Sequence, residues 1–330
     1  MDITIVIPTY NEENRLEKCL TSICKQDADG FKVKIIIVDD NSSDKTIYIA
    51  RKYGATIIKS GHRDIEISKY IGLLHTKTEL VCFLDADNWF PESSWLADAR
   101  DAIRENVGII GAQSAWFNFS KRDPLANRYC TLFGCMDPAV FYLGSSDRLT
   151  YTEGRWMPES SIVKEDLNYW VVKISDGDTS TYGSQGFLTF TEDARLYSAG
   201  GRFYHTDYVL DSCVKNKKKL IILKNTIGHD GCKDTKQLFN KLYRNISLFQ
   251  AASDRKYKYN INDIKMTLVA TKLITGICPM IDSLVGFLRG PKDIAWFMHV
   301  PISFGVGVMY SLIVLRAMIH KKIGRSGDIV

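Results

Sequence analysis

The sequence predicts an α/β fold with a mainly parallel sheet, followed by C-terminal membrane helices. Three observations support this prediction. Strand-like and helical segments alternate through the N-terminal third of the chain, which is typical of parallel strands joined by helices. Polar residues directly follow three of the predicted strands. A long segment near the C-terminus carries no formal charge.

The predicted elements differ in the spacing of their apolar residues. The predicted strands are short apolar runs at residues 3–7, 33–38, 55–58, 80–84 and 107–112. The predicted helices have apolar residues at helical spacing and cover residues 12–23, 44–53, 67–74 and 91–105. We expect Asn11 to cap the first helix and Gly54 to end the second. Residues 113–190 are less regular, and we interpret them as loops that cover the substrate, with some strand.

The C-terminal region is predicted to contact a membrane. As a helix, residues 294–315 would extend roughly 33 Å, enough for a hydrocarbon core of ~30 Å. The basic residues that follow are typical of a cytoplasmic flank. In residues 266–288, the charges of Lys272 and Asp282 offset the apolar content. We therefore keep two interpretations of this segment, a helix that spans the membrane and a buried or interfacial helix. Residues 289–293 would join the two helices as a hairpin.

A preceding segment has an apolar stripe beside basic residues. This pattern suits a helix on the membrane surface, or equally a helix packed against the globular domain. The stripe consists of Leu238, Leu242, Ile246 and Phe249.

Composition excludes some functions. Hydrophobic residues make up 45% and charged residues 25%, as in ordinary globular proteins. The net charge of +5 without a dense basic stripe does not indicate a nucleic-acid partner. The eight cysteines include no CxxC pair, so we expect free thiols and not a zinc site. The N-terminal apolar run is too short for a signal peptide, and we expect this part of the chain to stay in the cytosol.

Three predicted strands end in polar clusters, at residues 8–12, 39–43 and 85–87. Because ligands bind at the carboxyl ends of parallel strands, we expect the three clusters to converge on one edge. Asp85 and Asp87 would repel each other unless a cation neutralised them. Their oxygens suit Mg²⁺ or Mn²⁺, which share their ligand shell with phosphates.

Three stretches resemble the signature blocks of family-2 glycosyltransferases with the GT-A fold. They read IVIPTYNEENRLEKCLTSI, IIIVDDNSSDKT and ELVCFLDADNWFP, and they cover much of residues 1–92. The resemblance implies a GT-A catalytic domain and a nucleotide-diphospho-sugar donor. It also implies a divalent metal ion, Mn²⁺ or Mg²⁺, and inversion at the anomeric carbon.

The same resemblance implies roles for individual residues of these blocks. Pro8, Tyr10 and Glu12 would surround the base and ribose, and Asp40 would hydrogen-bond the base, uracil or guanine. A further stretch, ISKYIGL, resembles the family helix whose basic residue lies near the diphosphate. The residues expected to bind the nucleotide sugar are Pro8, Tyr10, Glu12, Asp40, Lys69, Asp85, Ala86 and Asp87.

Later blocks imply the remaining roles. RLYSAGGRFYHTDYVL resembles the block that carries the catalytic acidic residue, which aligns with Asp207. The family commonly has Glu-Asp where this chain has Thr-Asp. An Asp in the first turn of a helix can also have a structural role only, because it interacts favourably with the helix dipole. IGHDGCKD resembles the later His motif, so His229 would join Asp85 and Asp87 as a metal ligand. GSQGF resembles the acceptor-side loop, formed by Gly183, Ser184, Gln185 and Gly186.

These features predict an inverting, metal-dependent hexosyltransferase. It would move a sugar, with GDP-mannose as the first candidate donor, to a hydroxyl of a lipid-linked saccharide, and Asp207 would be the general base. One alternative is a polyprenyl-phosphate sugar synthase, whose anionic acceptor needs no base. Another is a catalytically inactive membrane scaffold that binds nucleotide sugars. A processive polysaccharide synthase is disfavoured because the chain lacks a QxxRW block.

Three regions are expected along the chain. Residues 1–232 would be the catalytic domain, residues 233–263 an amphipathic interfacial helix region, and residues 264–330 a membrane-anchoring hairpin with a basic tail. The protein would contact membrane lipid at the cell membrane, with its catalytic domain on the cytoplasmic side.

Overall fold

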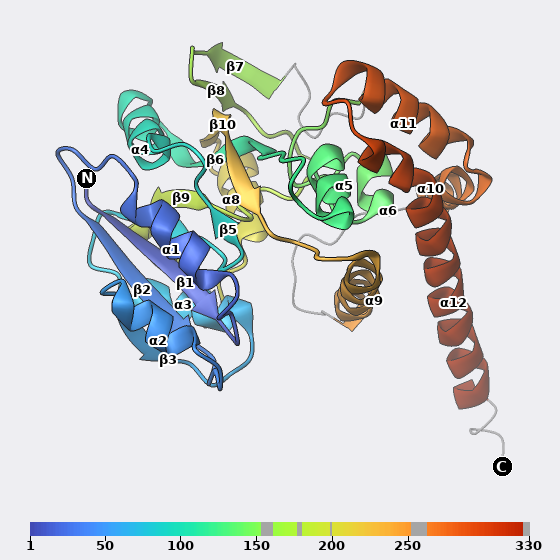
Figure 1. Ribbon diagram of the computed structural model, residues 1–330, viewed down its shortest axis with the longest axis horizontal. Helices are drawn as coiled ribbons and strands as arrows, with labels where there is room; N and C mark the ends of the chain where they lie inside the picture. The colour runs from blue at the N-terminus through green and yellow to red at the C-terminus, as the bar shows by residue number, and fades with distance from the viewer. Residues whose placement is uncertain (153–160, 177–179, 199, 252–262, 326–330) are drawn as a thin grey trace.

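The structure is a computed structural model that describes residues 1–152, 161–176, 180–198, 200–251 and 263–325. Its strands are β1 (Ile3–Thr9), β2 (Val33–Asp39), β3 (Thr56–Lys59), β4 (Leu80–Phe83), β5 (Asn88–Trp89), β6 (Ile109–Phe117), β7 (Ile162–Glu165), β8 (Tyr169–Val172), β9 (Phe187–Phe190) and β10 (Lys219–His229). They form one sheet in the order β3-β2-β1-β4-β9-β6-β10-β8-β7, and β5 pairs with β10 off this path (Figure 1).

Helices surround this sheet and continue beyond it. The helices of the N-terminal half are α1 (Leu16–Cys24), α2 (Thr46–Lys52), α3 (Ile65–His75), α4 (Trp95–Glu105), α5 (Leu125–Phe133) and α6 (Pro138–Tyr142). Those of the C-terminal half are α7 (Thr191–Tyr197), α8 (His205–Val214), α9 (Thr235–Ala251), α10 (Asp263–Thr275), α11 (Ile277–Arg289), the 3-10 helix η2 (Ile294–Met298) and α12 (His299–Arg325).

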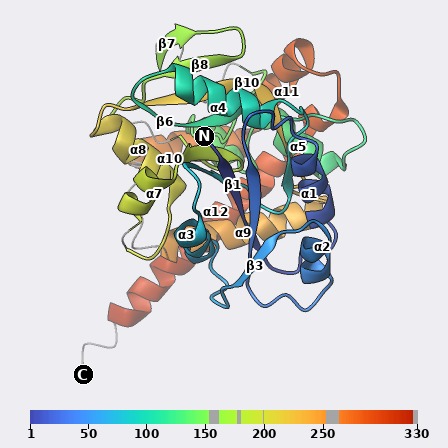
Figure 2. The same ribbon diagram turned by 90° about the vertical axis from the view of Figure 1, so that its left-hand side faces the viewer.

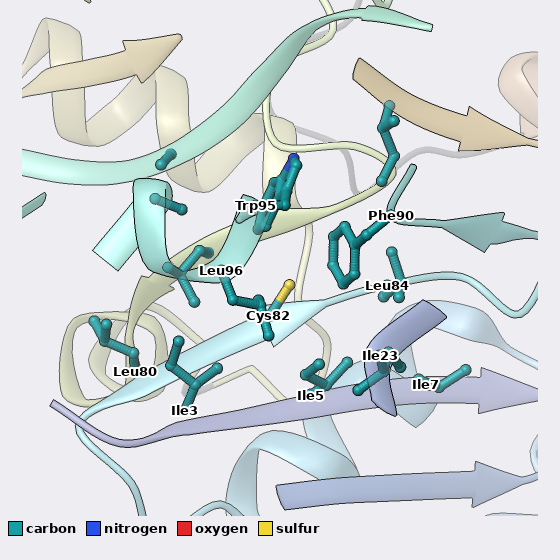
Figure 3. Close-up of a cluster of buried hydrophobic side chains, with 14 of the residues drawn as sticks. Ile3, Ile5, Ile7, Ile23, Leu80, Cys82, Leu84, Phe90, Trp95 and Leu96 are labelled. Carbon is teal, nitrogen blue, oxygen red and sulfur yellow. The ribbon is translucent and has the colours of Figure 1, made fainter. Parts of the chain in front are cut away.

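The central strand β1 is buried on both faces, which is typical of parallel strands covered by helices. Its residues Ile3, Ile5 and Ile7 pack with α1 and α4 on one face, where Trp95 is fully buried (Figure 3). On the other face, Val6 packs with α3 and α8. Helix α3 lies so close that a Cβ at Gly72 would fall 2.3 Å from Val6.

The expected convergence of strand ends is confirmed. Strand β1 runs parallel to β2 and to β4, with Ile3 opposite Val33 and Leu80. The carboxyl ends of these three strands therefore lie at the same edge of the sheet.

The expectation of a mainly parallel sheet is wrong, because the sheet is mixed. Strand β9 runs antiparallel to both β4 and β6, with Phe187 opposite Phe83. The chain enters β9 from the edge where β4 ends, so it must run back in the opposite direction. This reversal brings the residues just before β9 to the carboxyl end of β4.

The expected N-cap at Asn11 is also wrong. Helix α1 begins at Leu16, and Asn11 has a left-handed φ of 54°. Its amide donates to Ser42 Oγ, and its side-chain oxygen accepts from Ser43 N, both at 2.9 Å. Asn11 thus ties the loop after β1 to the loop after β2 instead of capping a helix. Gly54, with φ 68°, follows α2 as expected.

Residues 266–288 do not form one straight helix. Helices α10 and α11 meet at Gly276, whose φ of 71° allows a bend of 71° between them. Both charges of this segment turn toward α6. Asp282 accepts a 2.8 Å hydrogen bond from Tyr142, and the Lys272 ammonium lies 5.3 Å from the same ring.

Among the described residues, one helix is long and apolar enough to cross a membrane, or two if the bent pair is counted as one span. It covers Ile294–Leu312 and begins with the 3-10 turn η2. Within it, His299 is fully buried between the hydroxyls of Tyr129 and Tyr142, each at 3.1 Å. Helix α12 then projects away from the body in both views (Figures 1 and 2).

The amphipathic stripe of α9 faces the protein. Leu238, Leu242 and Ile246 are buried, the first two in the same cluster as α5 and η2, so packing against the body and not lipid exposure accounts for them. The side chain of Phe249 and all of residues 252–262 lie outside the described part of the predicted interfacial region.

Candidate functional site

The loops after β1 and β2 hold each other at the carboxyl edge of the sheet. Asp39 accepts hydrogen bonds from Ser42 N at 3.0 Å, from Ser42 Oγ at 2.6 Å and from Thr9 Oγ1 at 3.2 Å. Pro8 lies opposite Val38 in the ladder, and the buried part of β1 extends to Thr9. Tyr10 lies just beyond and is exposed.

The carboxylate of Asp40 is buried and binds its own chain. Its Oδ1 accepts from the amides of His62 and Arg63, both at 3.2 Å. Its Oδ2 accepts from Ser68 Oγ at 2.9 Å. In this structure Asp40 therefore fixes the loop before α3 against the end of β2.

Glu12 is paired with Arg15, a residue that the sequence analysis did not single out. The guanidinium donates two 2.7 Å hydrogen bonds to the Glu12 carboxylate and a third, at 3.1 Å, to Asp87 Oδ2. Burial raises the pKa of Glu12, and Arg15 opposes this shift. Arg15 thus links the first predicted block to the third. The Glu-x-x-Arg spacing in the first block was a local signal for this pair.

Asp85 and Asp87 follow β4 with the buried Ala86 between them. The Asp85 Oδ1 atom is buried without a hydrogen-bond partner, and it lies 3.6 Å from Lys69 Nζ. Lys69 is itself buried on α3. The close approach of α3 to the sheet therefore brings this ammonium to the end of β4.

His229 reaches the same place from a distant part of the chain. Strand β5 pairs with the end of β10, which puts His229 opposite Asn88. His229 Nε2 lies 3.7 Å from Asp87 Oδ2. Burial lowers the pKa of His229, but Asp87 outweighs it, so that the pKa is raised. Conversely, burial raises the pKa of Asp87, but His229 and Arg15 bring it well below its usual range.

A buried asparagine supports His229, and no local pattern in the sequence pointed to it. Asn127 of α5 donates to the carbonyl of His229 at 2.9 Å. Its side-chain oxygen accepts from the amides of Gly231 and Cys232, at 2.8 and 3.3 Å. Asn127 thus fixes the turn that follows β10.

The predicted acceptor loop lies beside the end of β4. Gly186 donates to the carbonyl of Phe83 at 3.2 Å, and Gly183 to Gln113 Oε1 at 2.6 Å. The carbonyls of Ser184 and Gln185 each accept a 2.7 Å hydrogen bond from the same buried guanidinium.

That guanidinium belongs to Arg148, which the sequence analysis missed. Its side chain is fully buried, and burial lowers its pKa to about 10, so it stays charged at neutral pH. Because a buried charge is costly unless it is well bonded, Arg148 fixes the backbone of the loop firmly.

Asp207 lies in the first turn of α8, next to this loop. It is buried, and the neighbouring Thr206 hydroxyl donates to the carbonyl of Tyr182 at 3.1 Å. Gly183 packs so tightly that a Cβ there would come within 3.2 Å of His205. The N-terminal turn of α8, on which Asp207 lies, is therefore packed against the predicted acceptor loop, and the loop in turn contacts the end of β4.

The donor set at the end of β4 is chemically suited to a divalent ion. Asp85, Asp87 and His229 offer the oxygen and nitrogen ligands that Mn²⁺ accepts, and Asp85 has an unpartnered buried oxygen. Within the described residues, however, no three such side chains converge as a ready-made metal centre.

Comparisons with known proteins agree with this architecture. Residues 4–157 match the model of the family "Glycosyl transferase family 2". A 4,4'-diaponeurosporenoate glycosyltransferase of Staphylococcus haemolyticus is 36% identical over 92 residues, which are 26% of this chain and 24% of that protein. The chain thus covers about a quarter of this relative.

A longer match is the poly(ribitol-phosphate) beta-N-acetylglucosaminyltransferase TarP of Staphylococcus aureus. It is 27% identical over 231 residues, 58% of this chain and 70% of that protein.

Among solved structures, the mannosyltransferase PcManGT from Pyrobaculum calidifontis, in complex with GDP-Man and Mn²⁺, is similar in fold. The TM-score is 0.52 at 14% identity, over 94% of this chain and 86% of that one. Residues 4–157 are thus similar to family 2 glycosyltransferases in sequence, and the α/β fold of the chain is similar to that of this mannosyltransferase.

Proposed function

We propose that the protein transfers a sugar from a nucleotide-diphospho-sugar to an acceptor hydroxyl, with inversion at the anomeric carbon. The observation that carries this proposal is the pair Asp85 and Asp87 at the shared edge of β1, β2 and β4, with three cationic side chains facing it. Donor ligands of this fold class bind at that edge. These side chains are Arg15, Lys69 and His229, and the last is cationic when its imidazole is protonated.

Asp85, Asp87 and His229 would hold a divalent ion, Mn²⁺ or Mg²⁺. When bound, such an ion neutralises charge on the departing diphosphate. Lys69 is buried beside Asp85 and would add a second positive charge to the same group. Pro8, Tyr10, Glu12 and Asp40 would surround the nucleoside.

Asp207 would take the proton of the acceptor hydroxyl as the hydroxyl attacks the sugar. Its position beside the loop Gly183–Gly186 supports this role, because the loop would orient the acceptor. Arg148 would hold that loop in place through the carbonyls of Ser184 and Gln185. Orientation of donor and acceptor at one edge would supply much of the remaining rate.

We propose GDP-mannose as the donor to test first, since the mannosyltransferase of similar fold was solved with GDP-Man and Mn²⁺. The alternatives remain a polyprenyl-phosphate sugar synthase and an inactive scaffold that binds nucleotide sugars. The first would not need Asp207 as a base, and the second would bind the donor without turnover.

We further propose a lipid-linked acceptor at the cytoplasmic face of a membrane, and the C-terminal helices support the contact with a membrane. Large apolar side chains are exposed along α11, η2 and α12, with Arg289 and Lys292 beside them. Apolar surface flanked by cations is typical of contact with a bilayer. The exposed apolar residues are Ile277, Met280, Ile281, Leu284, Leu288, Ile294, Phe304, Val308 and Leu312.

A thermal-shift panel of nucleotide sugars, each with and without Mn²⁺, tests the proposal. A ligand at 100 times its Kd stabilises the folded state by about 2.7 kcal/mol, which is a readily measured rise in Tm. We expect GDP-mannose with Mn²⁺ to give the largest rise and EDTA to cancel it. A panel in which no nucleotide sugar raises Tm would contradict the proposed function.

A further inference from the structure

An exposed arginine lies over the ring of an exposed tyrosine at the edge where the nucleoside is proposed to bind. The guanidinium carbon of Arg63 lies 4.5 Å from the ring centroid of Tyr10. Tyr10 follows β1, and Arg63 lies in the loop between β3 and α3. The face of an aromatic ring attracts a cation at this distance, so Tyr10 helps to position the guanidinium.

The backbone fixes this stacked arginine in an unusual conformation. Arg63 has a left-handed φ of 49°, which is uncommon for a residue with a Cβ. The Asp40 carboxylate stabilises it by accepting from the amides of His62 and Arg63. The Asp40 carboxylate thus binds the loop before α3, and this loop presents Arg63.

The guanidinium of Arg63 keeps its donors available. Within the part of the chain that the structure describes, it takes part in no hydrogen bond and no ion pair. By contrast, Arg15 donates three hydrogen bonds to carboxylates, and Arg148 donates to backbone carbonyls. Asp40 has the opposite character, because three donors already occupy its carboxylate.

A planar guanidinium recognises two adjacent acceptors with two parallel hydrogen bonds. Guanine presents such a pair, O6 and N7, on one edge. Uracil has a single acceptor, O4, on the corresponding edge, next to a C–H group. The Arg63 guanidinium can therefore discriminate between guanine and uracil. The Asp40 carboxylate cannot do so in the same way, because donors of its own chain already occupy it.

We propose that Arg63 reads the O6 and N7 edge of a guanine base in the donor, with Tyr10 holding the guanidinium in plane. This inference rests on the proposed nucleotide-sugar donor, and it makes Arg63 a specificity-determining residue for guanosine diphosphate over uridine diphosphate.

Calorimetric titration of the full-length protein with Mn²⁺ and each of four nucleotides tests the inference. The nucleotides are GDP, 7-deaza-GDP, IDP and UDP. A bidentate arginine–guanine contact discriminates by roughly 5- to 150-fold. We expect GDP to bind more tightly than UDP by a factor in that range, and 7-deaza-GDP, which lacks N7, to bind several-fold more weakly than GDP. IDP, which keeps O6 and N7, should bind like GDP.

Two variants of Arg63 test whether its guanidinium causes the preference for GDP over 7-deaza-GDP. Arg63→Met should weaken GDP by the same roughly 5- to 150-fold and remove the difference between GDP and 7-deaza-GDP. Arg63→Lys keeps the charge but should not restore that difference. Arg51→Met, at an exposed arginine of α2, removes the same charge away from Tyr10 and should leave all four affinities unchanged.

The outcomes separate this inference from the proposed function. If GDP binds with Mn²⁺ but Arg63→Met binds GDP and 7-deaza-GDP as the wild type does, the role of Arg63 is overturned and the donor class stands. A large loss with IDP would instead assign base recognition to Asp40 and also overturn the inference. If no nucleotide binds with Mn²⁺, the proposed function fails.

Discussion

The acidic edge of the sheet and the C-terminal helices distribute polarity in opposite ways. At the edge, Asp85 and Asp87 are partly open and face Arg15, Lys69 and His229. In the C-terminal helices Asp282 and His299 turn inward, and apolar side chains such as that of Leu288 are exposed. The edge is suited to a charged ligand and the helices to an apolar partner, so each region indicates the chemistry of what it binds.

Helix α5 joins the two regions. Its Asn127 holds the backbone of His229, and the next residue, Arg128, forms a 2.5 Å ion pair with the buried Asp293. Tyr129 then donates to or accepts from His299. The surface that is proposed to contact lipid is therefore anchored on the same helix that supports the proposed metal ligand.

The largest effect is expected at the acidic edge. Asp87→Ala should lower mannose transfer from GDP-mannose by about 10³-fold or more, because among the described residues Asp87 is the carboxylate that pairs with both His229 and Arg15. The donor affinity should also lose its dependence on Mn²⁺. Calorimetry with and without EDTA checks this, with Asp98→Ala on α4 as the control. Donor affinity that responds neither to the substitution nor to EDTA would remove the metal assignment.

The next effect concerns stability and not binding. Arg148→Met should lower the free energy of unfolding by about 2–4 kcal/mol, since it leaves the buried carbonyls of Ser184 and Gln185 without a donor. Urea denaturation measures this loss. Arg104→Met, at an exposed position on α4, should change stability little. An equal change in the two variants would show that Arg148 does not hold the loop.

At the C-terminal helices, a double substitution Leu284→Asp and Leu288→Asp should weaken binding to anionic vesicles by about 10-fold or more, because both exposed side chains would leave the lipid. Co-sedimentation measures it. Leu196→Asp, at an exposed leucine of α7, is the matched control. Vesicle binding that survives the double substitution would place the membrane contact elsewhere.

The smallest effect is a pH dependence at His229. Because the pKa of folded His229 is raised, its protonated form stabilises the metal-free protein below the unfolded value of about 6.5, and this stability is lost as the pH rises through the folded pKa. The Tm without Mn²⁺ should therefore fall slightly as the pH rises above about 6.5, and His229→Gln should lack this fall. Mn²⁺ affinity should change in the opposite direction, rising with pH, since the imidazole must lose its proton to bind. A Tm profile that is identical in the two proteins would contradict the pairing with Asp87.

The sequence predicted the acidic edge well because the information there is local. Asp85 and Asp87 directly follow an apolar run, and a parallel sheet brings such strand ends together. Gly276 was also a local signal for the bend between α10 and α11, but the apolar content of residues 266–288 obscured it.

Other features depend on contacts between distant segments, which a local pattern cannot reveal. Arg148 meets a loop about 36 residues later, and Asn127 meets a turn about 100 residues later. Strand β9 runs antiparallel because of where the chain re-enters the sheet, not because of its own residues. Asn11 has the composition of a helix cap, yet its partners lie in the loop after β2.

Asp207→Asn tests the central claim, that Asp207 removes the proton of an acceptor hydroxyl. Transfer of labelled mannose from GDP-mannose to a membrane lipid extract, and GDP-mannose affinity by calorimetry, should be measured side by side on this variant and on Asp211→Asn, one turn further along α8. We expect Asp207→Asn to lower turnover by about 10²- to 10⁴-fold with nearly unchanged donor affinity, because it keeps the shape but cannot take the proton. Asp211→Asn should keep most of its turnover. Near-wild-type turnover of Asp207→Asn would contradict the account and favour an acceptor that is already an anion, such as a lipid phosphate.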